Sequence, residues 1–192
     1  MASNYLTNPI VFLIQTLFGL YILAVLLRFL LQWVRADFYN PISQFLVKIT
    51  TPPLKILRRF IPGFGGIDLA SIVLAWILKY IELILVVLIS GSTIDFLGPL
   101  FWAIPDLVEL VINIFLFAVL IQVILSWINP GTYNPASALL YSLTDPIMRP
   151  ARKILPPISG LDLSPMLVMI ALILLKMLLM PPLKLLTGSP FV

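Results

Sequence analysis

The stretch YNPISQFLVKITTPPLKILRRFIPGFGGIDL, residues 39–69, decides how this chain is organised. It returns as YNPASALLYSLTDPIMRPARKILPPISGLDL at residues 133–163, a shift of 94 residues (from 39 to 133) that also places Trp33 on Trp127. The matched positions include polar, proline and glycine residues, which a merely apolar composition does not reproduce: Thr50, Pro52, Arg58, Pro62, Gly66 and Asp68 fall on Thr144, Pro146, Arg152, Pro156, Gly160 and Asp162. A period this long is too large for a solenoid unit and indicates a duplicated half-protein.

The composition assigns the chain to the membrane. It is 61% hydrophobic and 10% charged, whereas soluble domains average about 25% charged residues. Four apolar stretches, at residues 10–31, 69–90, 106–128 and 164–180, reach the roughly 17–25 residues that a helix needs to cross a bilayer. We therefore predict an all-α membrane protein with four transmembrane helices. They form two tandem two-helix repeats, residues 1–94 and 95–192, each with an interfacial amphipathic basic hairpin between its spans.

Missing residue types exclude several kinds of chemistry. The chain has no cysteine and no histidine, so this chain alone cannot supply disulfides, thiolate nucleophiles, Cys/His zinc sites or His-ligated haem. No catalytic residue, metal or cofactor is predicted, and we expect that the protein is not an enzyme. The net charge of +4 does not indicate nucleic acid, because the basic residues sit beside membrane spans.

The basic residues also predict the topology. They gather between the spans of each repeat, at Arg35, Lys48, Lys55, Arg58 and Arg59 and again at Arg149, Arg152 and Lys153, whereas residues 91–105 contain no Lys or Arg. The positive-inside rule then places both basic segments in the cytoplasm and both termini outside.

Each basic segment predicts a short helix. Asn40 and Asn134 are expected to be N-caps, with Pro41 and Pro135 in the first helical turn. Pro52 and Pro146 are expected to break or restart these helices, since proline lacks an N–H and restricts the residue before it. In the turn before the next span, Asp68 and Asp162 are expected to cap free backbone N–H groups.

The basic segments leave two interpretations open. They are either linkers held at the lipid headgroups by positive charge, or docking surfaces for a partner protein or an anionic lipid. Arg58 and Arg152 favour docking, because a general positive charge does not require one fixed position. The candidate docking residues are Thr50, Pro52, Arg58, Arg59, Thr144, Pro146, Arg152 and Lys153.

This arrangement resembles the YggT family, whose relatives include the YlmG proteins of cyanobacteria and plastids. The family pattern is approximately Thr-x-Pro-x-x-x-Pro-x-Arg-x-x-x-Pro, which the second repeat matches in full through Thr144, Pro146, Pro150, Arg152 and Pro156. The first repeat departs at Ile56, which predicts a more continuous helix there. The resemblance implies links to membrane-protein maturation in plastids, to cell division and nucleoid organisation, and to osmotic or ion tolerance. It implies no catalytic residue.

The charged residues Lys79, Glu82 and Lys176 lie inside the predicted spans. Lys79 and Glu82 are neighbours on one helix face, and the 94-residue shift places Glu82 on Lys176. Such charges are costly in a bilayer, by roughly 2.5–3.5 kcal/mol on insertion scales. Three roles remain open: a Lys79–Glu82 pair shielded in the bundle, a Glu82–Lys176 bridge between repeats, or a proton- or cation-conducting site. Arg28 lies within reach of the cytoplasmic end of its span, so we expect its side chain to extend to the headgroups. Its counterpart Gln122 is neutral, which supports a peripheral role for Arg28.

Two functional classes follow. The first is a non-enzymatic membrane protein that docks partner proteins or anionic lipid and supports assembly, maturation or organisation of membrane complexes. The second is a small ion or solute transporter or channel component that uses Glu82, Lys79 and Lys176. The expected partners are the lipid bilayer, anionic lipid, and either another membrane protein or further copies of this chain.

Overall fold

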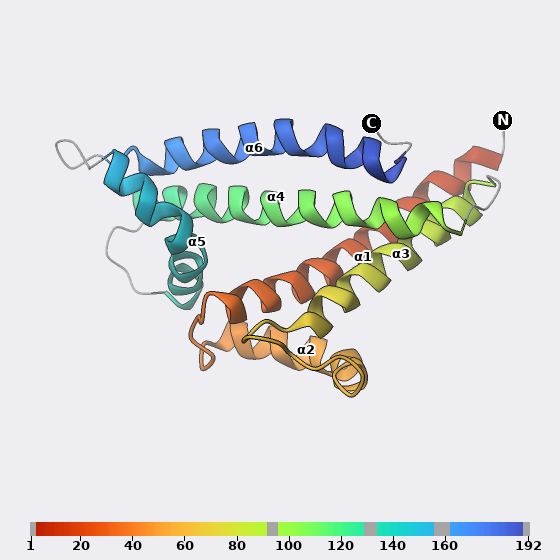
Figure 1. Ribbon diagram of the computed structural model, residues 1–192, viewed down its shortest axis with the longest axis horizontal. Coiled ribbons are helices and arrows are strands. Elements are labelled where there is room, and N and C mark those ends of the chain that lie inside the picture. The colour runs from red at the N-terminus through yellow and green to blue at the C-terminus, as the bar shows by residue number, and fades with distance from the viewer. Residues whose placement is uncertain (1–2, 92–95, 129–133, 156–161, 190–192) are drawn as a thin grey trace.

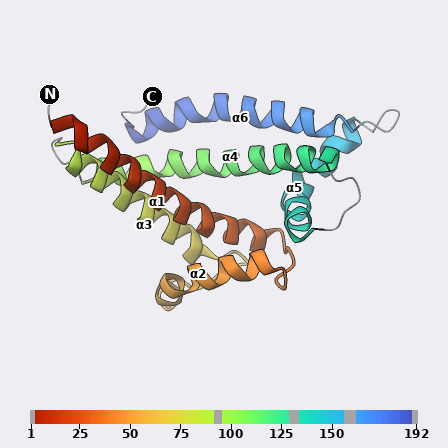
Figure 2. The same ribbon diagram turned by 180° about the vertical axis from the view of Figure 1, so that it is seen from behind.

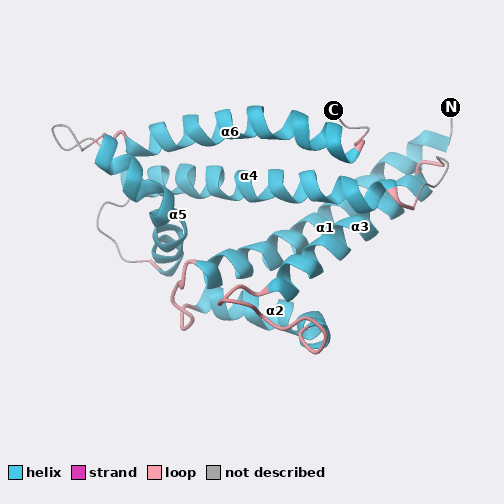
Figure 3. Ribbon diagram, in the orientation of Figure 1, coloured by secondary structure: helices cyan, strands magenta, loops and turns pink. Residues whose placement is uncertain are grey.

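The computed structural model describes residues 3–91, 96–128, 134–155 and 162–189. Those residues form six α-helices connected by loops (Figure 3). The helices are α1 (Ser3–Trp33), α2 (Pro41–Leu57), α3 (Leu69–Ile89), α4 (Gly98–Ile128), α5 (Pro135–Ile154) and α6 (Ser164–Thr187). The all-helical prediction is confirmed, with two tandem sets of three helices.

Four of these helices are long and apolar enough to cross a membrane: the segments Thr7–Trp33, Leu69–Ile89, Gly98–Ser126 and Ser164–Thr187. They form two antiparallel pairs, α1 with α3 and α4 with α6, which meet near the chain termini and diverge toward the other end (Figure 1). At that other end, α2 lies against α1 and α3, and α5 lies against α4 and α6 (Figure 2). Each repeat is therefore a helical hairpin with a third helix across one end.

Some predicted span limits are too short. Helix α4 begins at Gly98, eight residues before the predicted start at Asp106. Helix α6 continues through Pro181 and Pro182 to Thr187 and ends where Gly188 takes a left-handed φ of 65°. Prolines are tolerated in transmembrane helices because neighbouring groups satisfy the freed carbonyls, so the proline pair did not mark the end of the last span.

The starts of α2 and α5 follow the prediction. The Asn40 side chain accepts a hydrogen bond from the backbone N–H of Ile42, and Pro41 occupies the first helical turn. Asn134 does the same for Ala136 and forms a capping box with Ser137. Asn40 also donates from Nδ2 to the carbonyl of Pro135 at 2.8 Å. One predicted cap thus joins the two repeats at the end where they diverge.

The prediction that Pro52 and Pro146 break these helices is wrong, and so is the predicted difference in continuity between the repeats. Helix α2 runs through Pro52 and Pro53, and α5 runs through Pro146 and Pro150. In α2, Pro53 cannot donate to the carbonyl of Ile49 four residues earlier. The Tyr21 hydroxyl of α1 donates to that carbonyl at 3.0 Å instead. Tertiary contact thus satisfies the group that the proline leaves free.

Most of the buried core lies where α1 packs on α3 and on the inner faces of α2 and α4. Helix α2 contributes Ser43, Leu46, Thr50 and Leu54, which recur every three or four residues and so share one face. Many large apolar side chains remain exposed on the outer faces of the four long helices, including Leu17, Phe117 and Leu178. That distribution fits helices surrounded by lipid.

Candidate functional site

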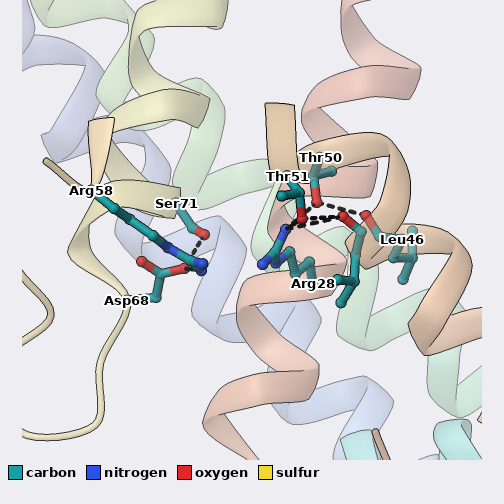
Figure 4. Close-up of polar contacts among 8 residues, drawn as sticks. Arg28, Leu46, Thr50, Thr51, Arg58, Asp68 and Ser71 are labelled. Atoms are coloured by element: carbon teal, nitrogen blue, oxygen red, sulfur yellow. Dashed lines mark hydrogen bonds and ion pairs between the residues drawn. The ribbon is translucent and has the colours of Figure 1, made fainter. Parts of the chain in front are cut away.

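The end of α1 contacts the middle of α2 through a buried arginine. Arg28 is 8% exposed. Its Nη1 donates to Thr50 Oγ1 at 2.8 Å, Thr51 Oγ1 at 3.1 Å and Val47 O at 3.3 Å (Figure 4). Arg28 does not extend freely to the surface as expected, because α2 covers it and supplies three acceptors. We call this contact the first clasp.

The second repeat has a neutral version of the same contact. Gln122 and Thr144, which the 94-residue shift places on Arg28 and Thr50, are both buried. The Thr144 hydroxyl donates to Gln122 Oε1 at 2.6 Å, with the carbonyl of Leu140 at 2.8 Å as a second acceptor. We call this contact the second clasp. A polar residue of the first span thus holds the threonine of Thr-x-Pro in both repeats.

The two clasps change the interpretation of the threonines. Thr50 and Thr144 were predicted to dock a partner or lipid, yet both have 0% exposure. A docking role for their side chains is therefore wrong, since each is enclosed between its interfacial helix and the preceding span. The prolines Pro52 and Pro146 are exposed.

Arg58 and Asp68 form an ion pair that joins the end of α2 to the start of α3 in the first repeat. Arg58 Nη2 lies 2.5 Å from Asp68 Oδ2, and the Ser71 hydroxyl donates to the same oxygen at 2.7 Å (Figure 4). Burial by itself raises the pKa of Asp68, but the hydrogen bonds from Arg58 and Ser71 outweigh it and hold that pKa below its ordinary value. Asp68 stands at the N-cap of α3 without a side-chain bond to a backbone N–H. Its predicted capping bond is therefore absent, because the arginine and serine take the carboxylate.

The second repeat forms the corresponding ion pair more loosely. Arg152 Nε lies 3.2 Å from Asp162 Oδ2, and both side chains are partly exposed. Asp162 also accepts the backbone N–H of Ser164 at 2.9 Å, as predicted for a cap. Desolvation raises the pKa of Asp162, but the Ser164 and Arg152 hydrogen bonds lower it below the ordinary value. Pro156 and Gly160, which complete the pattern, lie outside the described residues.

The four basic residues among the predicted docking residues separate into two groups. Arg58 and Arg152 are engaged in ion pairs with aspartates of their own repeats. Arg59 and Lys153 are exposed, and neither forms an ion pair with any residue that the structure describes. Of these four basic residues, only Arg59 and Lys153 are without a carboxylate partner among the described residues.

A cavity lies beside each clasp, and the two differ in size and charge. The cavity of the first repeat has a volume of about 680 Å³, and its lining includes Arg28, Arg35, Arg58 and Asp68. The cavity of the second repeat has a volume of about 230 Å³, and its charged lining residues are Asp145 and Arg152. Helix α1 ends beside the larger one, where Arg35 has a left-handed φ of 55°.

The charges inside the spans form two ion-pair groups with α4. Lys79 Nζ lies 2.8 Å from Glu82 Oε1 and 3.3 Å from Asp106 Oδ2. Lys176 Nζ lies 2.8 Å from Glu109 Oε1 and 3.0 Å from Asn113 Oδ1. The Lys79–Glu82 pair is confirmed, and the Glu82–Lys176 bridge is wrong. Helix α4 stands between α3 and α6 and provides each lysine with its own carboxylate.

Several residues of these sites were missed from the sequence. Gln122 has a recognisable signal, since it and Thr144 keep the spacing of Arg28 and Thr50. Asp106 and Glu109 fell at the predicted start of the third span, where they resemble ordinary helix-end charges. Only the true start of α4 at Gly98 places them more than two turns inside the helix.

Comparison with known proteins fits the tandem repeat arrangement. The family model described as CCB3/YggT matches twice, at residues 7–89 and 101–183. An uncharacterized protein of Pseudomonas aeruginosa is 48% identical over 187 residues, covering 96% of this chain and 95% of that protein. The uncharacterized protein YggT of Escherichia coli is 40% identical over 172 residues, covering 88% of each chain. An uncharacterized protein of Haemophilus influenzae is 36% identical over 163 residues, covering 85% of this chain and 87% of that protein. No solved structure matches.

Proposed function

This chain belongs to the CCB3/YggT family, and from that premise we propose a non-enzymatic protein of the bacterial inner membrane that docks partners through its basic segments. The basic segments bind partner proteins or anionic lipid. Docking at these segments supports assembly, maturation or organisation of membrane complexes, in processes such as cell division, membrane-protein maturation or osmotic tolerance.

The observation that carries this proposal is the exposed outer side of α2 and of the loop after it. Basic side chains at Lys48, Lys55 and Arg59 alternate there with exposed apolar ones at Phe45, Ile56 and Phe60. A helix of this kind at the end of a span pair lies at the headgroups, where each basic residue attracts anionic lipid by about 1 kcal/mol. Helix α5 repeats the arrangement with Arg149, Lys153 and Ile154 exposed near its end.

We assign this side to the cytoplasm on the positive-inside rule. Helices α2 and α5 share one end of the molecule and the two termini lie toward the other (Figure 1). The assignment predicts that Lys153→Cys resists an impermeant thiol reagent added to intact cells and that Ser90→Cys, at the opposite end of α3, reacts. The reverse pattern would overturn the orientation.

The docking proposal is tested by crosslinking from single cysteines. The chain has no native cysteine, so Arg59→Cys and Lys153→Cys are matched reporters at equivalent positions of the two repeats, and Ser90→Cys is the control. We expect a stoichiometric protein or lipid adduct at Arg59→Cys or Lys153→Cys and none at Ser90→Cys. With Arg59→Cys as the reporter, an acidic residue in place of Lys153 should weaken the adduct, and the converse should hold for Lys153→Cys and Arg59. Equal capture at all three positions would contradict docking through the basic segments.

A second candidate function, transport of an ion or small solute, rests on Glu82. This residue is 3% exposed, and its Oε2 has no hydrogen-bond partner among the described residues. It lines a cavity of about 270 Å³ together with Lys79, Asp106 and Glu109. With Lys176, the group contains three carboxylates and two ammonium groups, and intramembrane ionisable residues of this kind mark ion pathways.

Flux measurements separate the two functions. In liposomes containing the purified protein, transport predicts a cation or proton flux that Glu82→Gln abolishes while the protein stays monodisperse in detergent. Docking predicts no flux above empty liposomes and normal crosslinking by Glu82→Gln. A flux that Glu82→Gln leaves unchanged would contradict a transport role for this residue.

A further inference from the structure

The large cavity of the first repeat carries an excess of positive charge. Three arginines, Arg28, Arg35 and Arg58, line it against one carboxylate, that of Asp68. Arg58 is satisfied by Asp68, as Figure 4 shows. Neither Arg28 nor Arg35 forms an ion pair with any residue that the structure describes.

Arg28 uses only one of its three guanidinium nitrogens for hydrogen bonds to the described residues. All three of its hydrogen bonds leave from Nη1, so Nε and Nη2 hold none to the described residues. A buried, uncompensated guanidinium is costly, and an anion that accepts from its free N–H groups removes that cost.

Arg35 occupies a position where the backbone favours glycine. Its φ of 55° lies in the left-handed region at the end of α1, and it is the one non-glycine residue in the described chain with a positive φ. Glycine adopts this conformation without strain. Strain of this kind is retained where a side chain serves a site, and here it places a third guanidinium on the cavity lining.

Ser43 provides an independent indication that the cavity can bind a polar ligand. Its side chain is buried on α2 and lines the cavity, and its hydroxyl has no hydrogen-bond partner in the described structure. Buried polar groups are nearly always satisfied, so an unpaired hydroxyl facing a cavity indicates a ligand or ion that accepts or donates there. Together the lining offers several donors and a surplus of two positive charges.

We propose that this cavity binds the phosphate group of an anionic lipid, an inference that rests on the proposed docking function and gives its lipid occupant a specific site. Guanidinium forks match phosphate oxygens in geometry and charge. The volume of about 680 Å³ suits a headgroup, since ligand pockets span about 300–1,000 Å³. Arg28 lies five residues before the end of α1, about 7.5 Å along the helix axis, so the cavity starts at the edge of the apolar layer.

The second repeat does not offer this site. Its clasp has the neutral Gln122 in place of Arg28, and its cavity is about 230 Å³ with Asp145 in the lining. The sequence has Asn129 at the position equivalent to Arg35. The chain should therefore hold one tightly bound anionic lipid rather than two.

Native mass spectrometry of the purified protein with phosphatidylglycerol tests how many lipids each chain binds and whether the cavity arginines hold them. We expect one retained phosphatidylglycerol per chain, and at least fivefold weaker retention for Arg35→Gly. The control Arg59→Gln removes a positive charge from the same segment outside the cavity and should stay within twofold of the unmodified protein. Because glycine suits the backbone at this position, Arg35→Gly should fold at least as well as the unmodified chain. Retention by Arg35→Gly equal to that of the unmodified protein would overturn the proposal.

Cysteine protection gives a second readout inside the cavity. Phosphatidylglycerol in phosphatidylcholine nanodiscs should slow the reaction of Ser43→Cys with an anionic thiol reagent, compared with phosphatidylcholine alone. Ser137→Cys, the equivalent position in the second repeat, should show no such protection. Equal protection of both cysteines would overturn the proposal, because it would reflect general surface charge.

The source of the phosphate is distinguished in the same assay. Protection by phosphatidylglycerol but not by inorganic phosphate supports a lipid occupant, whereas protection by millimolar inorganic phosphate assigns the site to a soluble phosphate compound. Protection by neither overturns the phosphate site. In that case crosslinking from Arg59→Cys and Lys153→Cys still decides the proposed docking function, since neither residue lines the cavity.

Discussion

The two repeats share one geometry but differ in charge at its centre. In the first clasp Arg28 reaches two threonine hydroxyls and a carbonyl of α2. In the second clasp Gln122 has one hydrogen-bond partner among the described residues, Thr144. The Arg–Asp ion pair differs in the same sense, since Asp68 is nearly buried and Asp162 is partly exposed.

This difference separates what the duplicated fold requires from what one copy has gained. Both repeats keep a polar residue in the first span, a threonine in the interfacial helix and an arginine–aspartate pair before the second span. These contacts hold the interfacial helix in place. Only the first repeat adds the buried arginine and the cavity of about 680 Å³. The repeats are therefore alike in architecture and unlike in the charge and volume of this cavity.

The largest expected effect comes from removing each clasp. Arg28→Ala deletes three hydrogen bonds and leaves a buried void, so we expect it to lower the free energy of unfolding by about 3 kcal/mol. Gln122→Ala removes one contact and should cost about 1 kcal/mol. Thermal melting in detergent, monitored as the monodisperse fraction that remains in gel filtration, measures the stability loss of both variants. Equal losses would show that the charge of Arg28 adds nothing to the first clasp.

The ion pairs should show a smaller difference in the same direction. Arg58→Ala leaves the nearly buried Asp68 carboxylate without its charged partner, which should cost about 2 kcal/mol. Arg152→Ala breaks a more exposed pair and should cost at most about 1 kcal/mol. Asp68→Asn, measured by the same melting assay, is the companion variant. It should remove most of the further effect of Arg58→Ala, and additive losses would mean that the two residues act separately.

The smallest expected effect concerns Tyr21 and its counterpart Phe115. Tyr21 donates to the Ile49 carbonyl that Pro53 leaves free. In the second repeat, Phe115 replaces Tyr21 and Ile147 replaces Pro53, so both the hydroxyl and the proline are absent there. Tyr21→Phe should therefore cost about 1 kcal/mol. In the Pro53→Ile background the cost should nearly vanish, because an N–H again reaches that carbonyl. An unchanged cost in that background would contradict the compensation.

Local sequence signals were sufficient where the interacting groups are close in the chain. The Asn-Pro starts of α2 and α5 and the Lys79–Glu82 pair depend on residues within three positions of one another, and all were predicted. Proline was misleading for the same reason. The rule that proline ends a helix considers only the helix itself, whereas Tyr21 reaches Ile49 from another helix.

The sequence by itself determined the duplication, the four spans and the basic segments, because composition, apolar length and a fixed spacing are properties of the chain alone. Tertiary structure decided the rest. Helix α4 stands between α3 and α6 and supplies the carboxylates for Lys79 and Lys176. Helix α2 covers Arg28 and supplies its hydrogen-bond acceptors. Which partner a buried charge has depends on the helix that packs against it, and helix packing brings together residues far apart in sequence.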